Sequence, residues 1–239
     1  MTVRYIARIY TDFEEKFGLP RQSGLVPELK GRIVFEPEFR NPEALREIEG
    51  FSHLWLLFDF SLAHRDGWTA TVRPPRLGGN RRVGVFASRS PFRPNPVGLS
   101  CVKLEKVELT EKDGPVLTVS GIDTVSGTPI IDIKPYLPLS DCLPEARGGY
   151  SDEAAGYELG VEYAPGVRDN IPEHMRAAVE ACIKNDPRPS YQDEPERVYG
   201  MNFDGIDVKF TVLGGKALIT GADAASDGRF KEAEDDECP

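Results

Sequence analysis

The pattern of apolar and polar residues in the first 143 positions predicts a run of short β-strands. At residues 3–9 apolar side chains alternate with arginines, as in a strand with one buried face. A short helix should follow Asn41, which can cap it, with Pro42 in its first turn and Gly50 at its end. Further strands are predicted, between turns rich in glycine and proline, at residues 31–39, 51–60, 97–109, 115–123 and 129–133. Many strands and little helix favour a mainly β barrel or sandwich over alternating β and α units.

A change of composition after residue 143 separates a second, smaller unit. Residues 144–170 are small and polar and are interpreted as a linker. Residues 171–186 place apolar side chains on one face of a helix that ends at a proline, and three short strands follow it. We therefore predict a barrel or sandwich domain over residues 1–143 and a small α+β C-terminal domain over 171–230. The acids that crowd residues 231–239 predict a disordered acidic tail.

The segment at residues 84–100, GVFASRSPFRPNPVGLS, joins two apolar strands through a loop that contains three prolines. Proline fixes its own φ and disfavours the helical region for the residue before it, so this loop is predicted to be extended and rigid. Such a loop would hold Arg89, Arg93 and Asn95 in fixed positions for a ligand. The alternative is a stiff connection whose arginines are only solvated.

Charge is distributed unevenly along the chain. The net charge of −10 argues against a nucleic-acid partner, because phosphate contacts provide most non-specific affinity. Between residues 65 and 93, however, seven arginines stand against the single acid Asp66. This stretch predicts a basic patch that attracts a polyanion, with a purely solvated surface as the alternative. The candidates for contact with RNA are Arg76, Arg81, Arg82, Arg93 and Arg188.

The cysteines and histidines do not indicate a metal site. The four cysteines form no C-x-x-C pair and the three histidines lack ligand spacing, so neither a metal nor a disulfide is expected. The longest apolar run, residues 54–60, is too short to span a bilayer and contains Asp59, and the N-terminus lacks the apolar stretch of a signal peptide. We therefore predict a cytoplasmic protein without a membrane partner. The sequence also lacks the G-x-G-x-x-G and P-loop nucleotide motifs.

Six motifs, which together cover nearly the whole chain, resemble those of one family. They are PRQSGL at residues 20–25, FSHLWLLF at 51–58, TVRPPRLGGN at 71–80, the 84–100 segment, GTPIIDIKPYLP at 127–138 and DPRPSY at 186–191. Through them the chain resembles the TsaA-like tRNA methyltransferases known as TrmO. The resemblance implies a small closed β-barrel that binds S-adenosylmethionine without a Rossmann fold, a C-terminal domain, and a homodimer with the cofactor near the subunit interface. The implied activity is N6-methylation of threonylcarbamoyl-adenosine next to the anticodon of tRNA.

The resemblance also assigns a cofactor site, motif by motif. The site draws on the first loop, the end of the long apolar run, the proline-rich segment and the residues before the GTP motif. Where the family often has His-Gln, this chain has Ser61 and Leu62, and His64 further on is not assigned that role. The residues carried over are Arg21, Gln22, Ser23, Ser61, Leu62, Arg89, Leu99, Ser120, Gly121, Ile122 and Asp123.

The implied chemistry requires mainly alignment of the two reactants. Methyl transfer needs the acceptor nitrogen held close to an already activated methyl group, and it needs no metal. Loss of the proton on the urea-like N6 would help, with Asp132 or Asp123 as the candidate general base and Lys134 stabilising charge on the neighbouring carbonyl. Because Asp132 and Lys134 lie two apart on one strand face, a structural ion pair is the alternative. Two other functions stay open: methylation of a small molecule, and binding of a cofactor or RNA without catalysis.

Overall fold

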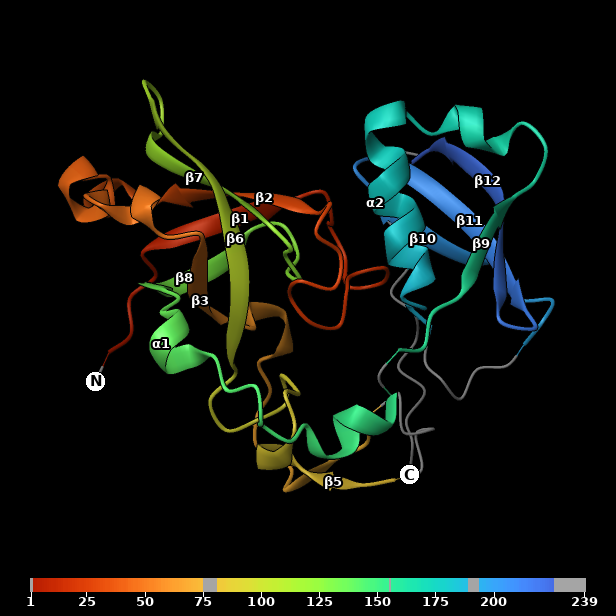
Figure 1. The fold of residues 1–239 in the computed structure, drawn as a ribbon, viewed down its shortest axis with the longest axis horizontal. Helices are drawn as coiled ribbons and strands as arrows, with labels where there is room; N and C mark the ends of the chain where they lie inside the picture. The colour runs from red at the N-terminus through yellow and green to blue at the C-terminus, as the bar shows by residue number, and fades with distance from the viewer. Residues whose placement is uncertain (1, 75–80, 155, 189–193, 226–239) are drawn as a thin grey trace.

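The computed structural model describes residues 2–74, 81–154, 156–188 and 194–225 (Figure 1). Six antiparallel strands close into a barrel in the order β1-β2-β7-β6-β3-β8, and β8 pairs back onto β1. The strands are β1 (Ala7–Thr11), β2 (Lys30–Phe35), β3 (His53–Asp59), β6 (Val97–Thr110), β7 (Gly114–Ser120) and β8 (Thr128–Pro135). The closed barrel confirms the mainly β fold class, and closure leaves these strands without an unpaired sheet edge.

The barrel interior is filled by alternate residues of each strand. Leu54, Leu56 and Phe58 of β3 are buried, whereas Trp55 and Leu57 between them are half-buried on the outer face. A continuous apolar run of this kind is typical of a strand buried on both faces. A strand of an antiparallel barrel has only one inner face, and the run differs from that expectation for this reason.

The segment between β2 and β3 differs from the predicted helix. Asn41 is a cap as predicted, since its side-chain oxygen accepts a hydrogen bond from the Glu43 amide at 3.1 Å. Glu47 then adopts a left-handed φ of 68°, which breaks any helix that would continue to Gly50. The segment therefore forms only short 3-10 turns, η1 (Pro37–Phe39), η2 (Pro42–Leu45) and η3 (Ile48–Gly50).

A small lobe connects β3 to β6 outside the barrel, at the lower end of the view in Figure 1. Its two short strands pair antiparallel, with Thr71 opposite Gly84. The lobe comprises η4 (Ser61–Ala63), β4 (Thr71–Val72), β5 (Val83–Gly84) and η6 (Val85–Ala87), and the chain beyond β8 forms α1 (Pro138–Asp141) and η7 (Gly149–Ala154).

The C-terminal unit is a four-stranded sheet with one helix packed on it. The sheet order is β10-β11-β12-β9, made by β9 (Gly160–Tyr163), β10 (Tyr199–Phe203), β11 (Ile206–Leu213) and β12 (Lys216–Ala224). After η8 (Val167–Asn170), the predicted amphipathic helix is α2 (Glu173–Lys184), and its buried residues join the core of the sheet. No helix in the described part of the chain is both long and apolar enough to cross a membrane.

Strand β9 lies inside the stretch that was interpreted as a linker, residues 144–170. It pairs in parallel with β12, with Val161 opposite Ala217. The C-terminal fold therefore begins before residue 171, which differs from the prediction. Val161 and Tyr163 alternate with Gly160 and Glu162, but so short a pattern is a weak signal, and β9 becomes a strand because β12, distant in sequence, offers it a partner. The predicted acidic tail at 231–239 lies outside the described residues.

The loop after β1 joins the two halves of the molecule, and Figure 1 shows it reaching from the barrel to the second sheet. Phe13 packs edge-on against Phe203 with ring centroids 5.2 Å apart. Phe17 stacks on Tyr199 at 6.3 Å. These aromatic contacts merge the barrel core and the C-terminal core into one apolar cluster.

Candidate functional site

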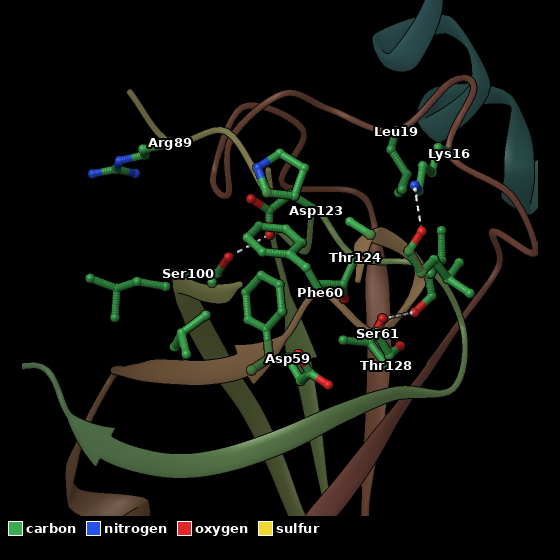
Figure 2. Close-up of a pocket in the computed structure, with 18 of the residues that line it drawn as sticks. Lys16, Leu19, Asp59, Phe60, Ser61, Arg89, Ser100, Asp123, Thr124 and Thr128 are labelled. Carbon is green, nitrogen blue, oxygen red and sulfur yellow. Dashed lines mark hydrogen bonds between the residues drawn. The ribbon is translucent and has the colours of Figure 1, made fainter. Parts of the chain in front are cut away.

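A cavity of about 840 Å³ opens at one end of the barrel (Figure 2). Four segments line it: part of residues 16–22 after β1, 58–63 at the end of β3, part of 88–100 leading into β6, and part of 123–128 between β7 and β8. Strands that run up and down around a barrel bring these loops to the same rim. Among the described residues, all that line the cavity belong to the barrel half, which makes this rim the candidate binding site.

Asp123 is a half-buried acid that lines this cavity. Ser100 Oγ, from a buried position of β6, donates a hydrogen bond to Asp123 Oδ1 at 2.6 Å, as Figure 2 shows. Burial raises the pKa of the Asp123 carboxyl and outweighs the opposing hydrogen bonds from Ser100 and the Ser23 amide. A carboxyl held in this way can accept a hydrogen bond from a hydroxyl group or take up a proton beside a ligand.

The proline-rich loop holds its two arginines at the rim of the cavity. Arg93 Nη1 donates to the carbonyl oxygen of Ser88 at 3.0 Å, which closes the loop on itself. Arg89 Nη1 donates to Gln22 Oε1 at 2.5 Å, which links this loop to the loop after β1. Both arginines and Gln22 line the cavity, as do Leu99 and Asn95. These five residues, all singled out in the sequence, are thus brought together from two distant segments.

The loop at residues 20–25 crosses closely over the turn that follows β7. Ser23 Oγ accepts a hydrogen bond from the Cys101 amide at 3.1 Å, and the Gly24 amide donates to the Gly121 carbonyl at 2.8 Å. Gly121 has a φ of 74°, and a Cβ there would lie 3.3 Å from the Gly24 backbone. The close crossing therefore depends on glycine, and it keeps Ser23 beside Asp123.

Arg21 connects the cavity to the C-terminal unit. It lines the cavity, yet its Nη2 donates to the carbonyl oxygens of Asp186 and Arg188 at 3.2 and 2.5 Å. Those two residues form a buried ion pair, in which Arg188 Nε lies 2.8 Å from Asp186 Oδ1 and Nη2 lies 3.0 Å from Oδ2. Arg21 thus has a structural role between the two halves that the sequence did not indicate.

Asp59 lines the cavity and was missed by the sequence analysis. It ends β3, is 6% exposed, and accepts a hydrogen bond from the Tyr5 hydroxyl at 2.6 Å. His64 Nε2 lies 2.7 Å from its other oxygen. An acid inside the longest apolar run was the available signal, because a buried carboxylate requires partners.

Other polar residues of the cavity give no comparable signal in the sequence. Short hydroxyl side chains in loops and strands are common, and only the fold gathers them. The polar cavity residues missed by the sequence analysis also include Lys16, Ser88, Ser100, Thr124 and Thr128.

Within the described residues, no group of three His, Cys, Asp or Glu side chains could hold a metal ion.

Several residues predicted for the site lie away from the cavity. Ser120 Oγ donates to the Glu105 carboxylate at 2.6 Å, and Ile122 belongs to the barrel core. Asp132 and Lys134 form an ion pair of 2.7 Å on the outer face of β8, and neither lines the cavity. Their geometry fits the structural alternative rather than the catalytic one.

The arginines predicted to contact RNA have different environments. Arg81 and Arg82 are exposed, and Arg81 pairs with Glu153 at 3.0 Å. Arg76 lies outside the described residues. Arg188 is only 7% exposed and held in its ion pair, so the structure does not support its contact with an RNA phosphate.

Comparison with known families covers both halves of the chain. Residues 8–142 match the tRNA-methyltransferase O N-terminal domain, and residues 159–224 match the TrmO C-terminal domain. The chain belongs to the TrmO family. This confirms the resemblance to TrmO that the sequence motifs indicated. The second match begins one residue before β9, in agreement with the pairing of β9 in the C-terminal sheet.

TrmO relatives match nearly the full length of the chain. It is 39% identical over 216 residues to a tRNA (adenine(37)-N6)-methyltransferase of Escherichia coli (strain K12), covering 87% of this chain and 91% of the relative. It is 43% identical over 215 residues to a putative S-adenosylmethionine-dependent methyltransferase RcsF of Pseudomonas aeruginosa, covering 87% and 90%. The crystal structure of TrmO from Pseudomonas aeruginosa has a TM-score of 0.76 at 34% identity, covering 94% of this chain and 99% of that one.

Ser61 and Leu62, which stand where the resemblance to TrmO leads us to expect His-Gln, line the cavity. The Leu62 carbonyl accepts a hydrogen bond from Lys16 Nζ at 3.4 Å (Figure 2). The imidazole and amide of the family pattern are replaced by a hydroxyl and an apolar side chain. A polar contact between a ligand and this part of the cavity must therefore come from the Ser61 hydroxyl or from the backbone.

Proposed function

We propose that this chain is an S-adenosylmethionine-dependent tRNA methyltransferase that methylates N6 of adenine 37, next to the anticodon, in tRNA that carries the threonylcarbamoyl group. The observation that carries the proposal is the cavity at the barrel rim, where the family loops meet around Asp123. The names of the full-length relatives support the reaction, the tRNA substrate and the cofactor. We further propose that the protein works in the cytoplasm, where its tRNA substrate is found.

The cavity residues fit this cofactor chemically. The half-buried Asp123 carboxyl, which lines the cavity and accepts a hydrogen bond from Ser100, suits the ribose hydroxyls or the ammonium group. Arg89 and Arg93 at the rim suit a carboxylate, which a guanidinium binds through two parallel hydrogen bonds. Apolar walls that include Leu19 and Leu99 suit the adenine ring. When bound, the cofactor supplies an activated methyl group.

The protein's own part in the reaction is to hold the acceptor nitrogen and to receive its proton. Alignment of two reactants in a fixed geometry can lower a barrier by roughly 7–11 kcal/mol. Of the two acids considered as bases, Asp123 lines the cavity and Asp132 does not. The raised pKa of Asp123 makes its carboxylate a better proton acceptor near neutral pH. Asp59, which is already engaged by Tyr5, is less available.

Incubation with labelled cofactor and tRNA, followed by nucleoside analysis, tests this function. We expect label in N6-methylated threonylcarbamoyl-adenosine, and little label when the tRNA lacks the threonylcarbamoyl group. Label in a small molecule but not in tRNA would favour a small-molecule methyltransferase. Cofactor binding without any transfer would favour a binding module.

We also propose a homodimer, which the family resemblance implies. Val97 and Leu99 of β6 are 42% and 47% exposed beside the cavity, so a second subunit could cover apolar surface there. Sedimentation at micromolar concentration with cofactor present should give the mass of a dimer. A monomer under those conditions would contradict this part of the proposal.

A further inference from the structure

Two aromatic side chains stand exposed on the lobe outside the barrel. Trp68 is 54% exposed and Phe86 is 73% exposed, although both are large apolar residues. Their ring centroids lie 6.0 Å apart and their planes are inclined by 33°. An exposed aromatic pair of this kind leaves ring faces open to a planar ligand.

The backbone of the lobe brings these two rings together from distant positions in the sequence. Strands β4 and β5 pair with Thr71 opposite Gly84, and the Val85 amide continues the pairing by donating to the Ala70 carbonyl at 2.9 Å. Trp68 and Phe86 follow at the same end of this short ladder. The pair is therefore positioned by main-chain hydrogen bonds and keeps its exposure.

Arginines lie at both ends of the lobe that carries the pair, and one end of the lobe adjoins the cavity. Phe86 lies in η6, and the residues that follow, Ser88 and Arg89, line the cavity. At the other end of the lobe, the pairing of Val72 with Val83 makes Arg73 and Arg82 neighbours. Aromatic faces among arginines suit an unpaired nucleic-acid strand, because bases stack on the rings and phosphates meet the guanidinium groups.

We propose that Trp68 and Phe86 form a stacking platform for an unpaired base beside the methylated adenine. This inference rests on the proposed function. Adenine 37 is part of a single-stranded loop, and its N6 can enter the cavity only if the base leaves the stack of its neighbours. A neighbouring base then lacks a stacking partner, and the platform replaces that partner close to the cavity.

A second copy of this chain is the alternative occupant of the same surface. In a two-fold symmetric contact centred on the platform, residues near the symmetry axis would face their own counterparts in the other copy. Arg73, Arg82 and Arg89 would then approach their own counterparts, and like charges repel. An RNA strand has the opposite charge, so the arginines around the platform favour RNA.

The test replaces both rings by leucine, with Trp68→Leu and Phe86→Leu in one variant. This change keeps apolar surface and removes the aromatic faces. We expect tRNA affinity to fall by about 5- to 150-fold, the loss of about one stacked base. Because no charge changes, the slope of log affinity against log salt should stay as in the wild type, and so should cofactor affinity by calorimetry. Phe86→Tyr, which keeps a ring, should retain affinity.

Leu109→Ala is the matched control, because Leu109 is also 73% exposed but lies at the far end of β6. It should leave tRNA affinity unchanged. If the double variant binds tRNA within twofold of the wild type, the platform is overturned while the proposed function stands. A double variant that changes its mass in sedimentation, with unchanged tRNA affinity, would show that a second copy occupies the surface.

A separate readout does not depend on methyl transfer or on tRNA. The chain has two tryptophans, so Trp55→Phe leaves Trp68 as the only indole. Single-stranded oligoadenylate should quench its emission, and the quenching should weaken when Phe86→Leu is added. Quenching without tRNA methylation would support the platform and contradict the proposed function. Emission that does not respond to the oligonucleotide would contradict the platform.

Discussion

Asp123 of the barrel and Asp186 of the C-terminal unit have different partners. Asp123 is half-buried and accepts a hydrogen bond from the hydroxyl of Ser100, and desolvation raises the pKa of its carboxyl. Asp186 and Arg188 are buried together, and the Arg188 guanidinium donates hydrogen bonds to both carboxylate oxygens of Asp186. A desolvated carboxyl without a bound cation keeps capacity for a ligand or proton, whereas a paired one is committed to structure.

The barrel and the C-terminal unit also contribute differently to the cavity. Among the described residues, the cavity wall belongs to the barrel, and the C-terminal unit reaches it through Arg21, whose guanidinium binds the carbonyls of residues 186 and 188. Arg21 is followed directly by Gln22, which holds Arg89. The C-terminal unit therefore supports the loop that positions the cavity arginines, and the chemistry belongs to the barrel.

The largest expected effect comes from breaking the buried pair with Asp186→Asn. Asn tolerates the left-handed φ of 48° at this position, so the change removes charge and leaves the backbone conformation accessible. Arg188 then loses the ion pair with Asp186 in its buried position, and the free energy of unfolding should fall by about 3–5 kcal/mol in urea denaturation. Glu158→Gln is the control, because its pair with Lys184 is exposed and should contribute less than about 1 kcal/mol. Equal effects of the two changes would contradict the contrast between buried and exposed pairs.

Arg89→Ala tests whether the ligand chemistry belongs to the barrel. Removal of one charge-assisted hydrogen bond should weaken cofactor binding by about 1.5–3 kcal/mol in calorimetry, while the fold stays intact. Arg46→Ala is a matched control, because Arg46 is an exposed arginine of the barrel half that does not line the cavity. Unchanged cofactor affinity in Arg89→Ala would remove this side chain from the site.

Asp123→Asn tests the raised pKa of the half-buried Asp123 carboxyl through the pH dependence of stability. Because the folded pKa of Asp123 is raised above 3.8, the folded state binds the proton more tightly than the unfolded state, and ionisation destabilises the protein. Wild-type stability should therefore decline relative to Asp123→Asn as pH rises from about 3.8 through the folded pKa, by about 1.4 kcal/mol for each unit of difference. Thermal denaturation between pH 4 and pH 8 measures this change. A stability difference that does not vary with pH would contradict the assigned pKa direction.

The smallest effect should come from the exposed arginines Arg81 and Arg82. Changing both to Gln should weaken binding of all tRNA species and flatten the slope of log affinity against log salt by about 0.7–0.9 for each phosphate that the variant no longer neutralises. Arg81 already pairs with Glu153, so its contribution should be the lesser one. The matched double variant on the C-terminal unit is Lys184→Gln with Lys216→Gln, for which we expect no change of slope. A flatter salt slope in the Lys184 and Lys216 variant alone would indicate that RNA binds to the C-terminal unit rather than to the barrel half.

The sequence by itself determined the local elements. Alternation predicted the barrel strands, the amphipathic pattern predicted α2, and the prolines predicted that residues 88–96 form no helix. For Asp132 and Lys134, which were candidates for catalysis, the spacing gave an ion pair on one strand face as the alternative, and that pair is present. These features depend on neighbours in the chain, so the local pattern contains the information. The family motifs added the loops that meet at the cavity.

Only the tertiary structure decided which residues share the site and which are buried. Asp59 gains its partner Tyr5 from 54 residues away, β9 gains β12, and Arg188 is buried by the pair it forms and by its contact with Arg21. Each of these outcomes depends on a contact between segments distant in sequence. Local propensity does not encode such contacts, because their free energy comes from burial and pairing that exist only once the barrel has closed and the C-terminal sheet has packed on its loop.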